Sequence, residues 1–362
     1  MDRNDGLAYE HDGVRFAYPP TVIWEEDERW TYAREPLLRR MPDDSLVCLH
    51  YSGGPREPDD DNVELITRSY DDGATWSAPQ VLFEHPSRGV WVTELFAEAG
   101  SPCAFVHTFE TANHYGDLHT YRSWTTDHGK SWSEPISLPG GVGHVSVRQG
   151  MVLRDGAWLF PVYWQEVTHG FAWQRRDGRS DRRSSTGQQD WLFCCGVLRS
   201  DDEGRSFRLH GSIRHPRFRL WEPNVAELGD GSLMMLMRVT GAESGALWRS
   251  DSTDGGVTWS MPHPTDIPNP STKLTLFTHD GAVILLNNPN PVIGERKPLT
   301  LWVSHDDGAT WPTRLILADH PDGRGVYYPH GLMDRERQIL YLACDIKTRH
   351  FLIKIPFGDF LA

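Results

Sequence analysis

Apolar residues in this sequence gather in short runs, and no long amphipathic helix pattern lies between them. Segments that alternate or run apolar over strand length include Val63–Arg68, Leu233–Arg238, Leu299–Ser304 and Ile339–Cys344. The longest uncharged apolar runs, around Leu233–Met237 and Ala282–Leu286, are also of strand length. They fall far short of the roughly 18 residues of a membrane-spanning helix. The pattern therefore predicts an all-β chain.

An eight-residue motif, Ser/Thr-x-Asp-x-Gly-x-Ser/Thr-Trp/Phe, recurs along the chain. Its five copies are Ser69–Trp76, Thr125–Trp132, Ser200–Phe207, Ser252–Trp259 and Ser304–Trp311. An Asp carboxylate can accept the N–H groups of a turn, and Gly supplies a positive φ. The closing aromatic residue can then pack between neighbouring sheets. The motif predicts five equivalent hairpin corners.

The spacing of these motifs predicts a β-propeller. Their Asp residues, at positions 71, 127, 202, 254 and 306, are 56, 75, 52 and 52 residues apart, which suits one four-stranded blade per period. The long interval holds a polar, Arg-rich insertion, Phe171–Asp190. Five marked blades and the unmarked stretch 320–362, closed by the N-terminal strand, make six. We expect residues 1–362 to form a single six-bladed propeller domain.

Composition and charge narrow the function classes. Hydrophobic residues make up 38% of the chain and aromatic residues 11%, which supports a large core and excludes global disorder. The net charge of −14 argues against nucleic acid or an anionic membrane as the main partner.

Cysteines and the first residues bear on the compartment. Five cysteines, two of them adjacent, do not make a disulfide framework, and no Cys-x-x-Cys pair predicts zinc. Residues 1–20 contain no apolar leader core. We therefore expect a soluble, cytoplasmic protein without a metal or cofactor. The oligomeric state is left open.

The five motifs resemble the Asp-boxes of the sialidase superfamily, whose members are six-bladed propellers. In that family the boxes are structural and lie away from the active site, so their Asp residues are not catalytic candidates. Asp-boxes also occur in propellers that are not enzymes. The function therefore needs separate evidence.

Further segments resemble sialidases in the same order along the chain. Tyr32–Leu38 is similar to the segment with the first of three arginines that bind the substrate carboxylate, and the resemblance makes Arg34 that arginine. By the same resemblance Arg238 and Arg296 are the second and third. The other matches give Asp60 as the acid/base, Glu222 as the partner of the nucleophile, and Tyr328 as the nucleophile.

These residue types suit one chemistry. Guanidinium groups can grip the carboxylate on the anomeric carbon of a 2-keto-acid glycoside. That carboxylate would repel an anionic nucleophile, whereas a neutral Tyr whose proton passes to a Glu avoids the repulsion. A separate carboxylic acid protonates the leaving oxygen. The sequence thus predicts a retaining exo-glycosidase for a terminal acidic sugar, most simply an exo-α-sialidase.

The sequence also departs from the family and leaves alternatives. Glu35 stands where the family has Ile, and Tyr328 is followed by Pro-His-Gly rather than the usual polar residues. Tyr327 and Asp61 therefore remain alternatives to Tyr328 and Asp60. A hydrolase or polysaccharide lyase for another acidic sugar such as a uronate, with catalytic His107, His144 or His330, is a second hypothesis. A glycan-binding propeller without activity is the third.

Overall fold

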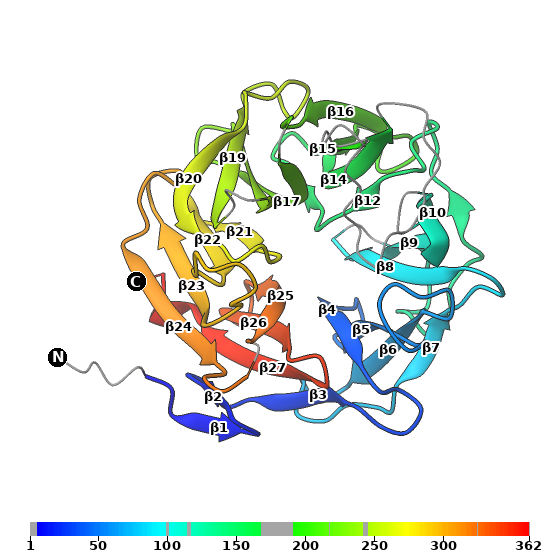
Figure 1. Ribbon diagram of the computed structural model, residues 1–362, viewed down its shortest axis with the longest axis vertical. Coiled ribbons are helices and arrows are strands. Elements are labelled where there is room, and N and C mark those ends of the chain that lie inside the picture. The colour runs from blue at the N-terminus through cyan, green and yellow to red at the C-terminus, as the bar shows by residue number, and fades with distance from the viewer. Residues whose placement is uncertain are drawn as a thin grey trace.

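The computed structural model describes residues 6–98, 101–113, 117–167, 191–216, 218–241, 245–323 and 325–361. Six antiparallel sheets are arranged around a central axis (Figure 1), which confirms the predicted six-bladed propeller. The insertion Phe171–Asp190 lies outside the described residues. No helix in the described ranges has the length and apolar character needed to cross a membrane.

Each blade runs from an inner strand beside the axis to an outer strand. The first blade contains β4 (Ala33–Arg40), β5 (Leu46–Ser52), β6 (Val63–Ser69) and β7 (Gln80–Phe83). The second contains β8 (Gly89–Phe96), β9 (Cys103–Phe109), β10 (His119–Trp124) and β11 (Ile136–Ser137). In the third, β12 (Ser146–Val147) and β13 (Met151–Val152) both pair with β14 (Trp158–Val167), followed by β15 (Trp191–Ser200) and β16 (Arg208–Ile213).

The other three blades follow the same plan. The fourth contains β17 (Arg219–Glu227), β18 (Leu233–Thr240), β19 (Ala246–Ser252) and β20 (His263–Pro268). The fifth contains β21 (Thr275–His279), β22 (Ala282–Asn287), β23 (Leu299–Ser304) and β24 (Thr313–Asp319), and is extended by β2 (Val14–Phe16) and β1 (Tyr9–His11). The sixth contains β25 (Tyr327–Asp334), β26 (Ile339–Asp345), β27 (Arg349–Pro356) and β3 (Thr21–Glu25). Two short 3₁₀ helices are η1 (Thr111–Asn113) and η2 (Phe357–Asp359).

The N-terminal strand β3 closes the ring. It pairs antiparallel with β27, with Val22 opposite Phe351, and so supplies the outer strand of the sixth blade. The hairpin β1–β2 precedes β3 in the chain and lies at the edge of the fifth blade, where Phe16 of β2 pairs with Ala318 of β24. The pattern of the sequence did not predict this hairpin, because its strands are only three residues long.

The five box motifs form equivalent turns between the third and fourth strands of their blades. In the first box, Asp71 accepts hydrogen bonds from the backbone N–H and the hydroxyl of Thr75, at 2.8 and 2.6 Å. These bonds lower the pKa of Asp71 to about 2. Gly73 has a φ of +86°, and a Cβ there would collide with Leu352. The predicted structural role of the boxes is confirmed.

Apolar residues fill each junction between neighbouring blades. Leu49 and Val92 belong to the cluster between the first two blades, and Leu286 and Leu342 to the cluster between the last two. The box aromatics join these clusters, as Trp132 does between the first and second blades. Packing between blades, rather than a single common core, therefore fixes the inner strands in position.

Candidate active site

The predicted site residues come from several blades and gather at the axis. Arg34 is on β4, Arg238 is on β18, and Arg296 is on the loop between β22 and β23. The carbon at the centre of the Arg34 guanidinium lies 5.2 Å from the ring centroid of Tyr327. That of Arg296 lies 5.3 Å from Tyr327 and 5.4 Å from Tyr328. Arg238 Nη1 is 3.4 Å from the Tyr328 hydroxyl. All three arginines thus meet at one pair of tyrosines on β25.

We define the central cluster as the ionisable residues that meet there. It comprises Arg34, Glu35, Glu57, Arg148, Glu222, Arg238, Lys273, Arg296, Tyr327, Tyr328 and Asp345. The sequence had not singled out Glu57, Arg148, Lys273 or Asp345.

Three inner strands share a local distortion that presents a side chain to this cluster. Glu35, Glu222 and Tyr328 each precede a proline and have a positive φ, of 48°, 46° and 52°. At each of them the register with the next strand shifts, as expected of a bulge. Proline suits a bulge because it has no N–H to leave unpaired. Such backbone strain persists where the surrounding structure enforces it, and it concentrates at functional sites.

Arg148 joins two of these bulges. It follows β12, is only 2% exposed, and makes ion pairs with Glu35 at 3.2 Å and with Glu222 at 3.1 Å. The Glu35 side chain, which departs from the family pattern, therefore has a dedicated buried partner. No motif in the sequence marked Arg148.

Glu222 and Tyr328 approach the same guanidinium nitrogen. Arg238 Nη1 donates to Glu222 Oε2 at 2.7 Å and to the Tyr328 hydroxyl at 3.4 Å. Burial alone would raise the pKa of Glu222, but Arg238 and Arg148 outweigh it and hold the pKa below its usual range. Burial, followed by the negative charge of Glu222, raises the pKa of Tyr328 to about 12. At neutral pH the cluster therefore holds an ionised Glu222 beside a protonated Tyr328.

The two tyrosines differ in exposure. Tyr327 is 5% exposed and lies against Arg34 and Arg296, whereas Tyr328 is only partly buried. Their rings meet edge to face, with centroids 6.1 Å apart. Of the two hydroxyls, that of Tyr328 is the one bonded beside Glu222.

The charges of Arg34 and Arg296 are balanced differently. Arg34 makes ion pairs with Asp345 at 3.5 Å and with Glu57 at 3.7 Å. Within the described residues Arg296 has no carboxylate partner, and its guanidinium donates a hydrogen bond to the Ser271 carbonyl at 3.4 Å. Arg296 therefore remains available to an incoming anion.

Lys273 adds a further cation to the central cluster, near Glu35, Arg148 and Glu222. It is 6% exposed, and in the described part of the chain no carboxylate lies within ion-pair distance of its ammonium. Burial lowers its pKa to about 8, against the opposing effect of Glu35. Nothing in its sequence context marked it.

The structure places Asp60 differently from the other predicted residues. Its carboxylate Oδ1 accepts the backbone N–H of Thr111 at 2.6 Å, a bond that ties the β5–β6 loop to η1. Neighbouring Asp61 is exposed, and its backbone N–H bonds to Asp59 at 3.2 Å. On the same loop it is Glu57 that contacts Arg34.

The histidines considered for a lyase make structural contacts. His107 bonds to Thr93 and Thr120, and His330 accepts the Leu38 N–H at 3.2 Å. Burial lowers the pKa of both. His144 bonds to the Leu118 carbonyl at 2.9 Å. A group of three or more His, Cys, Asp or Glu residues placed to hold a metal is not found in the described ranges.

The boxes lie at the opposite ends of the strands from the cluster. Arg34 is near the start of β4, whereas Arg40 at its end contacts Asp72 of the first box at 2.8 Å. Since alternate strands run in opposite directions, every third-to-fourth turn lies at that same end. The boxes are therefore remote from the tyrosines.

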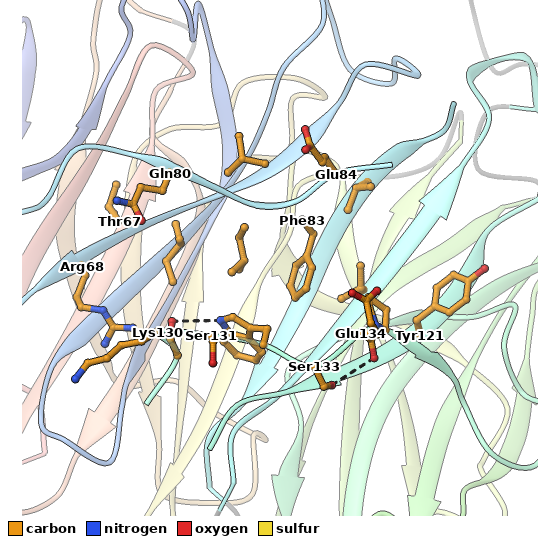
Figure 2. A pocket seen from close by; sticks show the side chains of 18 of the residues that line it. Thr67, Arg68, Gln80, Phe83, Glu84, Tyr121, Lys130, Ser131, Ser133 and Glu134 are labelled. Atoms are coloured by element: carbon orange, nitrogen blue, oxygen red, sulfur yellow. Dashed lines mark hydrogen bonds between the residues drawn. The ribbon is translucent and has the colours of Figure 1, made fainter. Parts of the chain in front are cut away.

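A hollow of about 840 Å³ lies away from the central cluster, between the first and second blades (Figure 2). Phe83, Tyr121 and Lys130 are among its lining residues. Arg68 there donates to Ser45 Oγ and to the His128 carbonyl, so its guanidinium has structural partners. None of the central cluster lines this hollow.

Comparison with known proteins agrees with this picture. The sequence profile of the BNR repeat-like domain matches residues 44–340. The chain is 24% identical over 313 residues to a sialidase of Bacteroides fragilis, which covers 75% of this chain and 52% of that protein. It is 24% identical over 320 residues to a sialidase of Micromonospora viridifaciens, covering 78% and 46%. The chain belongs to the sialidase superfamily.

Solved structures show the same fold. The Hadza microbial sialidase Hz136 superposes with a TM-score of 0.69 at 18% identity, covering 92% of this chain and 67% of that one. A protein of unknown function from Dyadobacter fermentans superposes with a TM-score of 0.70 at 18% identity, covering 95% and 99%. This chain spans about half the length of the two curated sialidases. Membership of the sialidase superfamily thus rests on sequence and fold together.

Proposed function

We propose that this protein is a retaining exo-glycosidase that removes a terminal acidic sugar, most simply an exo-α-sialidase. The observation that supports it best is the meeting of Arg34, Arg238 and Arg296 around Tyr327 and Tyr328. Planar guanidinium groups from three places in the fold can hold one carboxylate from several sides. The substrate's carboxylate would bind there, with Arg296 as the arginine that lacks a carboxylate partner among the described residues.

In the first step, the Tyr328 oxygen attacks the anomeric carbon and the bond to the leaving oxygen breaks with its electron pair. The Tyr328 proton passes to Glu222, whose lowered pKa keeps it ionised at neutral pH. A carboxylic acid on the β5–β6 loop protonates the leaving oxygen. We predicted Asp60 for this role from the sequence.

In the second step, a water molecule attacks the anomeric carbon and the bond to Tyr328 breaks. The loop carboxylate, which gave up its proton in the first step, takes one from the water. Glu222 returns a proton to the Tyr328 oxygen. Configuration at the anomeric carbon is retained because it is inverted twice.

The test is a screen of aryl glycosides of sialic acid and of common uronic acids. Release of free sialic acid supports the proposal, and the anomeric form of the first product, followed by NMR, tests retention. Release from uronides alone would shift the substrate to another acidic sugar. Absorbance from a new unsaturated bond would identify a lyase. Binding without turnover of any glycoside would identify a glycan-binding propeller.

A further inference from the structure

The loop between β5 and β6 carries four acidic residues, and two of them are compared as candidates for one role in the proposed reaction. Asp60 was predicted from its place in the sequence, and Glu57 stands three residues earlier. An acid that protonates the leaving oxygen must reach the substrate that the arginines hold. The contacts of the two side chains distinguish them.

Asp60 is held by a structural bond. Its Oδ1 accepts the Thr111 backbone N–H at 2.6 Å, and among the described residues no hydrogen bond or ion pair joins its carboxylate to the central cluster. A carboxylate used in this way secures the loop to η1. That bond fixes the side chain toward η1, on which no member of the central cluster lies.

Glu57 turns toward the cluster. Its Oε2 lies 3.7 Å from Arg34 Nε, and its side chain is 33% exposed, so that a substrate can reach it. The charged groups that act on it are Arg34 and Glu35 of β4, Asp345 of β26, and Arg296 of the β22–β23 loop. Arg296 in turn lies over Tyr328. Glu57 therefore borders the place where both the carboxylate and the nucleophile are held.

We propose that Glu57, rather than Asp60, is the acid/base residue of this enzyme. The proposal rests on the proposed glycosidase function. In the first step the Glu57 carboxyl group gives its proton to the glycosidic oxygen as the bond to the anomeric carbon breaks. In the second step the Glu57 carboxylate takes a proton from the water that displaces Tyr328.

The electrostatic setting of Glu57 fits this cycle. Loss of solvation where the carboxyl group packs against the protein raises its pKa to about 7, and the positive charge of Arg34 opposes this rise. A general acid works best when its pKa is near the working pH, because it can then both lose and regain its proton.

The experiment compares Glu57→Gln with Asp60→Asn in the full chain. A Gln side chain keeps the size of Glu57 but has no acidic proton, and Asn at position 60 keeps the acceptor for the Thr111 N–H. Rates are measured on a natural sialoside, whose leaving group needs protonation, and on an aryl sialoside with an acidic phenol, which does not. Melting temperatures check that both variants fold.

We expect Glu57→Gln to reduce kcat/KM, which reports the first step, by about 100-fold or more on the natural sialoside and much less on the aryl sialoside. The alkaline fall of kcat/KM, near pH 7 in the wild type, should disappear in this variant. Added azide should restore turnover on the aryl sialoside and give the glycosyl azide. Asp60→Asn should keep the wild-type ratio of the two rates and the wild-type pH profile.

Other outcomes separate the two proposals. An active wild type whose selective loss appears in Asp60→Asn, and not in Glu57→Gln, overturns the role of Glu57 and restores Asp60. Equal losses of kcat/KM on both substrates in Glu57→Gln overturn the role of Glu57 as well. A folded wild type that turns over none of the glycosides overturns the proposed function itself, and the role of Glu57 with it.

Discussion

Glu35 and Glu222 stand on different blades, yet their carboxylates bind the two ends of one guanidinium group. The Arg148 Nη1 nitrogen is 3.2 Å from Glu35, and Nη2 is 3.1 Å from Glu222. All three side chains are buried. Two carboxylates so close would repel each other strongly in a medium of low dielectric without the cation between them. Arg148 therefore holds the first, third and fourth blades together at the axis.

Replacing Arg148 with Met should destabilise the protein by about 3–5 kcal/mol at pH 7, because it leaves the buried Glu35 carboxylate without its ion-pair partner and takes one of two cations from Glu222. Urea unfolding at pH 7 and pH 5 measures the loss. In the variant the carboxylates will hold a proton more tightly when folded than when unfolded. Its stability should therefore improve as the pH falls, and the deficit at pH 5 should be smaller.

Arg148→Lys is the matched control, since it keeps one positive charge at the site but loses the fork. It should lose less stability than the Met variant at pH 7. A Met variant as stable as the wild type at pH 7 would show that the bridge contributes nothing.

Replacing Tyr328 with Phe should abolish the covalent intermediate that a slow fluorinated sialoside traps, because the nucleophilic oxygen is gone. Tyr327→Phe is the matched control. It removes the neighbouring hydroxyl and should leave the adduct intact, since Tyr327 is buried between Arg34 and Arg296. Mass spectrometry of the labelled peptide reads out both. An adduct on Tyr327 would reverse the assignment.

Replacing Arg296 with Lys should raise KM for the acidic substrate by about 10-fold to 100-fold, as expected for losing a bidentate, charge-assisted contact. Stability should change little, because Arg296 is partly exposed and donates a hydrogen bond to one carbonyl, that of Ser271. Arg205→Lys is a suitable control, since its ion pair with Glu203 is fully in solvent, with 79% of the Arg205 side chain exposed. An unchanged KM in Arg296→Lys would contradict its role in binding the carboxylate.

The box motifs predict an acid limit to stability. Hydrogen bonds from Thr310 lower the pKa of Asp306 from its ordinary 3.8 to about 2. The stabilisation is therefore present above about pH 4 and is lost as the pH falls through about 2. Asp306→Ala should melt below the wild type at pH 6, and the gap should close between pH 4 and pH 2. Asp322→Ala, which removes an exposed aspartate outside the boxes, should show no such gap. A gap for Asp306→Ala that stays constant with pH would contradict this origin.

The fold could be predicted because its signal is local. Each box fits within eight residues, where the Asp, Gly and aromatic positions are fixed by one turn. Spacing then gave the number of blades. The hairpin β1–β2 escaped prediction because three-residue strands leave too little pattern to recognise.

The central cluster could be predicted only in part. Arg34, Arg238, Arg296 and Tyr328 were found because their neighbours resemble a known family, and the structure brings them together. Arg148 and Lys273 owe their place to the meeting of separate blades at the axis, which no local pattern records. Glu57 and Asp60 illustrate the same limit. On an irregular loop, sequence spacing does not tell which carboxylate faces the axis.

The pairing of β3 with β27 also constrains the order in which the propeller can fold. Val22 is synthesised well before Phe351, so β3 must wait for its partner strand. Until then the chain is an open arc with two unpaired edges, a hazard for aggregation. Contacts between such distant segments slow folding, because the loop must close before the contact rewards it. The ion pair of Arg34 on β4 with Asp345 on β26 also joins the early and late parts of the chain, so we expect this part of the site to form only when the ring closes.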